Sequence, residues 1–128
     1  MIRAVRDFGR LIHASRYLGR ASRFDESGRD DKAAKAYAGL LKALDSLPSL
    51  PASESAFSIR DGMHFSIRIV ATTRFAALAA RIGDASVAQQ RAREGLDLYD
   101  RFPRVTRRDS DEYSRKWIEW ARTYLRLG

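Results

Sequence analysis

Apolar residues recur at intervals of three and four positions along most of this chain, which is the period of an amphipathic helix. The stripes are interrupted at short segments rich in proline, glycine and polar residues, where a helix ends. The pattern predicts an all-α protein with five antiparallel helices, in residues 1–24, 30–47, 56–82, 84–102 and 109–128. A length of 128 residues suits a single helical domain, residues 1–128.

One stretch inside the third predicted helix fits two periods. Met63, Phe65, Ile67 and Ile69 alternate with more polar residues, which is the strand period. Plotted as a helix, residues 63–69 are apolar nearly all round, as in a central helix packed on several sides. No second strand is visible to pair with a strand here, so we favour a helix and keep the strand as the alternative.

Small residues follow a second regularity along the chain. Three alanines are each followed seven positions later by a glycine, and the first two glycines are followed five positions later by another alanine. Small residues let helix backbones approach closely, and glycine permits the left-handed turn between paired helices. The pattern predicts one structural unit used twice, with a final half-unit, carried by Ala21, Gly28, Ala33, Ala76, Gly83, Ala88 and Ala121.

This arrangement resembles the tetratricopeptide repeat, whose paired helices pack through small residues and turn at a glycine. The resemblance implies two helical hairpins and a capping helix, in residues 1–48, 56–103 and 109–128, with a loop at 49–55. It also implies a groove, lined by the first helix of each hairpin, that binds a segment of another protein.

The chain also departs from that family. Gly28, Gly83 and Gly128 are 55 and 45 residues apart, whereas family repeats run about 34 residues. The four positions where many members carry a clamp for a terminal carboxylate hold no cation or amide, so that function is not implied: Leu18, Ser22, Thr73 and Ala77. The alternative fold is a plain helical bundle.

Positive charge is in excess, with 24 Lys and Arg against 16 Asp and Glu and a formal net charge of +8. This excess favours an acidic partner. The arginines predicted to contact it are Arg3, Arg6, Arg10, Arg20, Arg74 and Arg81. The alternative is a nucleic-acid-binding protein that uses the basic N-terminal helix, which also has the composition of targeting peptides and membrane-surface helices.

The sequence contains little that points to catalysis. The absence of cysteine excludes disulfides, thiolate zinc sites and cysteine nucleophiles. His13 and His64 lack the spacing of a metal motif, and no phosphate-binding or nucleophile-elbow motif is present. We therefore predict no catalytic, metal-binding or cofactor-binding residues and no enzyme activity.

No apolar run approaches the roughly 20 residues that a membrane-spanning helix needs. The sequence as a whole predicts a basic, soluble, cytoplasmic protein–protein interaction module: an adaptor, a chaperone or an immunity-type inhibitor.

Overall fold

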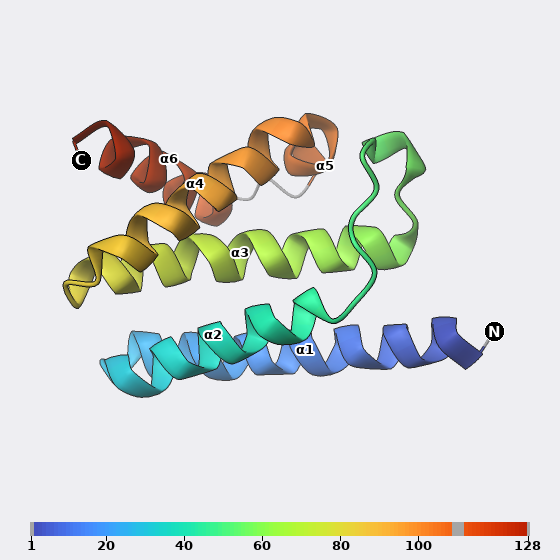
Figure 1. Ribbon diagram of the computed structural model, residues 1–128, viewed down its shortest axis with the longest axis horizontal. Coiled ribbons are helices and arrows are strands. Elements are labelled where there is room, and N and C mark those ends of the chain that lie inside the picture. The colour runs from blue at the N-terminus through green and yellow to red at the C-terminus, as the bar shows by residue number, and fades with distance from the viewer. Residues whose placement is uncertain (1, 109–111, 128) are drawn as a thin grey trace. The chain divides into compact units, whose positions relative to one another are not determined.

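A computed structural model describes the backbone of residues 2–108 and 112–127, and the side chains of residues 6–105 and 115–127. Over these residues the chain forms helices and no strand, which confirms the all-α prediction (Figure 1). The elements are α1 (Ile2–Glu26), α2 (Asp30–Asp45), the 3-10 turn η1 (Glu54–Ala56), α3 (Ile59–Arg81), α4 (Ala85–Arg101), α5 (Pro103–Arg108) and α6 (Glu112–Leu127).

The chain divides into two compact units, Met1–Arg68 and Ile69–Gly128. The boundary between them falls within α3, so that helix contributes its first turns to one unit and the remainder to the other.

The ambiguous residues 63–69 are helical and lie within α3. The helix starts at a capping box that the periodicity did not reveal. The Asp61 N–H donates to Ser58 Oγ at 3.2 Å, and the Ser58 N–H donates to Asp61 Oδ2 at 2.8 Å. This reciprocal pair satisfies two backbone donors at the start of the helix.

In the first unit, α2 packs against α1, and Figure 1 shows it running back along that helix. The two helices bury alanines and leucines, most of them with exposed fractions of 4% or less, together with the ring of Tyr37. The Tyr37 hydroxyl donates to Asp25 Oδ2 at 3.0 Å, so its polar end is satisfied. The buried apolar residues of these two helices include Leu11, Ala14, Ala21, Ala33, Tyr37, Leu40, Leu41 and Leu44.

The turn between α1 and α2 is a glycine C-cap. Gly28 has a φ of 76°, in the left-handed region that favours glycine. The Arg29 N–H donates to the Phe24 carbonyl at 2.9 Å, and the Gly28 N–H donates to the Asp25 carbonyl at 3.2 Å. This pair of bonds is a Schellman motif, which satisfies the last carbonyls of α1.

The turn between α3 and α4 has the same local structure. Gly83 has a φ of 87°, and the two matching bonds run from Asp84 to Ala79 at 2.8 Å and from Gly83 to Ala80 at 3.3 Å. Asp84 then caps α4 by accepting from the Val87 N–H at 3.2 Å. Two segments 55 residues apart therefore fold into the same turn.

In the second unit, α3, α4 and α6 meet at three alanines. Ala76, Ala92 and Ala121 are each 0% exposed, and their cluster is covered by the partly buried side chains of Leu96, Trp120, Tyr124 and Leu125. The rings of Trp120 and Tyr124 stack with their centroids 5.1 Å apart. Gly128, the third glycine of the pattern, lies outside the described residues.

Residues 103–108 form a short helix, α5, where the sequence pattern placed a turn between the fourth and fifth helices. Pro103 ends α4 because it cannot continue the hydrogen-bond ladder. It is equally suited to the first position of a helix, where its missing N–H has no intrahelical partner to lose. One proline therefore both ends α4 and begins α5.

Replacement of Gly95 by alanine should destabilise the protein by about 1–3 kcal/mol, because a β-carbon at this position would lie 2.7 Å from Thr73 Cγ2. Thr73 has little freedom to move away, since its hydroxyl donates to the Ile69 carbonyl at 2.8 Å and its side chain is buried. Urea denaturation measures the change in the free energy of unfolding.

The matched control is Gly19→Ala, because a β-carbon there meets nothing within 4 Å. It should stabilise the protein by up to about 1 kcal/mol through helix propensity. Equal stability of the two variants would contradict the close approach of α4 to α3 at Gly95.

Candidate functional site

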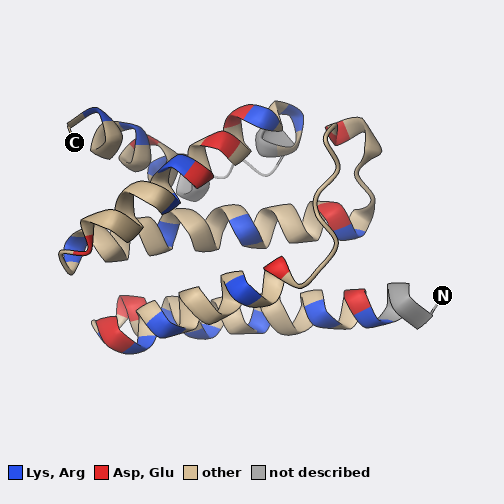
Figure 2. Cartoon of the chain, in the orientation of Figure 1, with Lys and Arg blue, Asp and Glu red and all other residues tan. Residues whose placement is uncertain are grey.

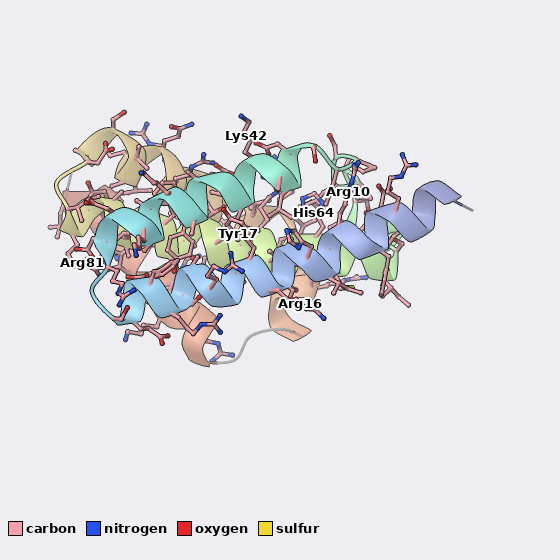
Figure 3. The ribbon with its side chains drawn as sticks, turned by 90° about the horizontal axis from the view of Figure 1, so that it is seen from below. Arg10, Arg16, Tyr17, Lys42, His64 and Arg81 are labelled. Atoms are coloured by element: carbon pink, nitrogen blue, oxygen red, sulfur yellow. The ribbon has the colours of Figure 1, made fainter. Side chains whose placement is uncertain are left out.

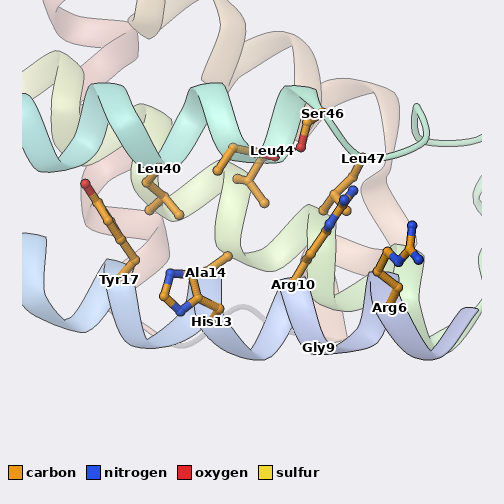
Figure 4. Close-up of a pocket in the computed structure, with 11 residues that line it drawn as sticks. Arg6, Gly9, Arg10, His13, Ala14, Tyr17, Leu40, Leu44, Ser46 and Leu47 are labelled. Atoms are coloured by element: carbon orange, nitrogen blue, oxygen red, sulfur yellow. Dashed lines mark hydrogen bonds between the residues drawn. The ribbon is translucent and has the colours of Figure 1, made fainter. Parts of the chain in front are cut away.

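A groove lies between α1 and α2 in the first unit and has a volume of about 510 Å³. Figure 4 shows side chains of the two helices facing each other across it. We call it the α1–α2 groove and define it by Arg6, Gly9, Arg10, His13, Ala14 and Tyr17 on one side and Leu40, Ala43, Leu44, Ser46 and Leu47 on the other. Its volume falls in the range of ordinary ligand pockets.

Helical spacing explains the composition of each wall. Arg6, Arg10, His13 and Tyr17 follow one another at intervals of four, three and four residues, so they form one stripe along α1. The leucines of the opposite wall have the same spacing and are at most 8% exposed. The groove therefore has an apolar floor with a polar, mostly basic stripe along one edge.

The basic edge has no acidic residue to neutralise it. Arg6 and Arg10 are exposed, and neither forms an ion pair within the part of the chain whose side chains are described. Asp7, between them in sequence, is buried, and its Oδ2 lies 3.4 Å from Arg60 Nη1. Figure 2 shows Lys and Arg along the length of α1 and acidic residues gathered at its turn into α2.

Tyr17 closes the end of the groove farthest from Arg6. Its ring lies between α1 and α2, whereas Arg16 lies on the side of α1 away from α2 (Figure 3). A β-carbon on Gly39 would lie 3.0 Å from the Tyr17 hydroxyl oxygen, so the glycine makes room for the phenol. The ring of His13 stands edge-on to that of Tyr17, with centroids 6.3 Å apart.

The arginines predicted to contact a partner have different environments. Arg6 and Arg10 line the groove, and Arg20 is exposed on α1 outside the lining set. The side chain of Arg3 lies outside the described residues. Arg81 is exposed at the C-terminal end of α3, in the second unit.

The prediction for Arg74 requires a correction. Its side chain is only 6% exposed, and its guanidinium carbon lies 5.8 Å from the centre of the Trp117 ring. It lies in a stretch of α3 that is buried on all sides, from Ala71 to Ala76, so a surface role does not apply to it.

Sequence reasoning missed several residues of the groove. Leu40 and Leu44 lie on the apolar stripe of the predicted helix 30–47, which marks them as core residues, and the sequence pattern assigns His13 and Tyr17 to no site. The usable signal was the α1 stripe itself, in which two arginines are followed by two aromatic side chains, and the small residues Gly9 and Gly39.

His64 does not line the groove but connects two helices of the first unit. It is 4% exposed, and its Nε2 accepts from Arg68 Nε at 3.1 Å. Arg68 Nη1 in turn lies 2.9 Å from Asp45 Oδ1 at the end of α2. Burial, and after it the charge of Arg68, lowers the pKa of His64 to about 4, so the ring is neutral at physiological pH.

Among the described residues, no group of three His, Asp or Glu side chains is placed to hold a metal ion. None of the described helices combines the length and the hydrophobicity needed to cross a bilayer. Comparison of the chain with protein-family models, curated proteins and solved structures finds no match.

The free energy of unfolding should fall as the pH is lowered from about 6.5 to about 4. In this range His64 is protonated in the unfolded chain but stays neutral in the folded protein. The contribution is fully present above the unfolded pKa and is lost on approach to the folded one, and it amounts to about 3 kcal/mol. Urea denaturation at a series of pH values measures it.

The control is His64→Gln, whose side-chain oxygen can accept from Arg68 but does not titrate. Other groups also titrate in this range, so the informative quantity is the difference between the two proteins. Parallel stability curves for the wild type and the variant between pH 6.5 and 4 would show that His64 does not contribute.

Proposed function

We propose that this chain is a non-catalytic protein–protein interaction module that holds a segment of a partner in the α1–α2 groove. The observation that supports this best is the combination of an apolar lining with Arg6 and Arg10, which are exposed along one edge and form no ion pair with any side chain that the structure describes. Recognition grooves typically combine apolar contact area with a few polar groups that orient the ligand. An adaptor, a chaperone and an immunity-type inhibitor all use such a surface.

The dimensions of the groove suit a polypeptide segment. Arg6 and Tyr17 are eleven residues apart on α1, which corresponds to about 16 Å along the helix axis. A partner helix of three turns covers this length, as does an extended segment of about five residues.

The titratable groups of the groove favour binding over catalysis. Its lining includes Arg6, Arg10, His13 and Tyr17 but no carboxylate within the described part of the chain. A paired acid and base, or a nucleophile held by an oriented base, is the usual minimum for hydrolytic chemistry. Here His13 contacts the edge of an aromatic ring instead.

The repeated small residues support a helical-repeat scaffold of the tetratricopeptide type. The turns at Gly28 and Gly83 share one hydrogen-bond pattern, and the alanines at corresponding positions, Ala21 and Ala76, are both 0% exposed. Scaffolds of this type present rigid surfaces to segments of other proteins. The α1–α2 groove differs from the groove that the resemblance implies, because it lies between the two helices of one hairpin and not along the first helices of both.

The second candidate is a nucleic-acid-binding protein, which the exposed arginines of α1 favour: Arg6, Arg10, Arg16, Arg20 and Arg23. The tryptophans do not add a stacking platform to it. Trp120 is stacked on Tyr124 and packed against the alanine cluster, and Trp117 lies beside Arg74. We therefore prefer the protein partner.

Selection from a phage library of random 12-residue peptides tests the proposal. We expect the purified chain to enrich peptides that bind the α1–α2 groove, and the variant Gly9→Phe to weaken their binding by about tenfold or more. Gly9 lines the groove and a β-carbon there meets nothing within 4 Å, so a phenylalanine can be placed at the groove without a clash at its β-carbon. Fluorescence anisotropy of labelled peptides measures the change in Kd.

The control is Gly19→Phe, on the same helix, where a β-carbon also meets nothing within 4 Å and which lies outside the groove. Enriched peptides that bind the two variants equally would refute the groove as the binding site.

A generic oligonucleotide is assayed in parallel. Tight binding at physiological salt, with an affinity that falls steeply with the logarithm of salt concentration and is equal in both variants, would favour the nucleic-acid function.

A further inference from the structure

We propose that the α1–α2 groove selects acidic amphipathic helices, in which two side-chain carboxylates one turn apart pair with Arg6 and Arg10 and apolar side chains of the same face contact the apolar lining of the groove. This inference rests on the proposed function and adds the chemical class of the partner segment.

The spacing of the two arginines determines the spacing of the acids. Arg6 and Arg10 are four residues apart on α1, which is about 6 Å along the helix axis. Acidic residues at i and i+4 of a partner helix have the same separation and lie on one face. Each guanidinium can donate two parallel hydrogen bonds to a carboxylate, which makes such a pair directional as well as attractive.

The distribution of charge along the groove determines which end of a bound segment carries the acidic residues. Both arginines lie at the end formed by Ser46 and Leu47, and Tyr17 lies at the end formed by Leu40 (Figure 4). The acids of a bound segment therefore lie over the first end, and its apolar residues over the second, one and two turns farther along the same face. Leu40 and Leu44 are at most 1% exposed and lie beneath the groove, so its accessible apolar surface includes the half-buried Tyr17 and the exposed Ala43.

The arginine pair favours side-chain carboxylates over a terminal carboxylate. A single C-terminal carboxylate offers one negative charge to two cations that stand a full turn apart. Two glutamates or aspartates neutralise both arginines, so neither arginine loses its hydration without gaining an ion-pair partner. The segment is therefore expected to bind from the interior of a chain as well as from its end.

Two further arginines on α1 allow the local effect to be separated from the overall charge. Arg16 and Arg23 are exposed and, within the described side chains, form no ion pair, but neither lines the groove. Reversing this pair changes the net charge of the protein by the same amount as reversing Arg6 and Arg10. Only the reversal of Arg6 and Arg10 should weaken the binding of a ligand held in the groove.

The experiment uses the peptides enriched by the full chain, resynthesised with an amidated C-terminus. We expect them to carry two acidic residues at i and i+4, followed by apolar residues on the same face. The double variant Arg6→Glu/Arg10→Glu should weaken binding by about tenfold or more, and Arg16→Glu/Arg23→Glu by less than about threefold. Peptides with both acids replaced by lysine should regain affinity for the Arg6→Glu/Arg10→Glu protein.

Circular dichroism melting verifies that both double variants fold, and Arg6→Gln/Arg10→Gln serves if the charge reversal impairs folding. The inference is overturned if the enriched peptides lack paired acids, if the two double variants weaken binding equally, or if amidation abolishes binding. In each of these cases, the proposed function is still supported if the Gly9→Phe variant binds the enriched peptides more weakly than the wild type does. If Gly9→Phe leaves peptide affinity unchanged, both the inference and the proposed function are refuted.

Discussion

Close contact between helices at small residues is the constraint on which the structure of both units depends. Ala21 and Ala33 in the first unit, and Ala76, Ala92 and Ala121 in the second, are completely buried. A side chain larger than alanine at such a contact would push the helices apart, since protein interiors have almost no free volume. At Gly95 the tolerance is smaller still, because even a β-carbon would meet Thr73.

The same constraint shapes the candidate binding site. Gly39 gives the phenol of Tyr17 the space to lie between α1 and α2, and Gly9 leaves the wall of the groove open near Arg6 and Arg10. Leucines then form the floor where α2 presents larger side chains. The groove is therefore a consequence of how small and large residues alternate along two packed helices, and it is held by the packing of the first unit.

Several features agree with the sequence because their causes are local. The turns at Gly28 and Gly83 need a left-handed residue, and glycine is the residue that takes this conformation at no steric cost. Residues 63–69 lie in a helix that starts with a capping box a few residues earlier, a local signal that favours the helix over the strand. Pro103 illustrates the limit of such reasoning, since a proline that ends one helix is equally suited to begin the next.

The sequence by itself determined the all-α class, the turns at Gly28 and Gly83 and the excess of positive charge, because periodicity and glycine act on neighbouring residues. Only the tertiary structure decided which arginines remain exposed: Arg6 and Arg10 line a groove, whereas Arg74 is buried beside Trp117. It also joined His64 through Arg68 to Asp45 and set Tyr17 against Gly39. These contacts join residues from different helices, and the helical period within one segment carries no information about which residue of another helix lies across from it.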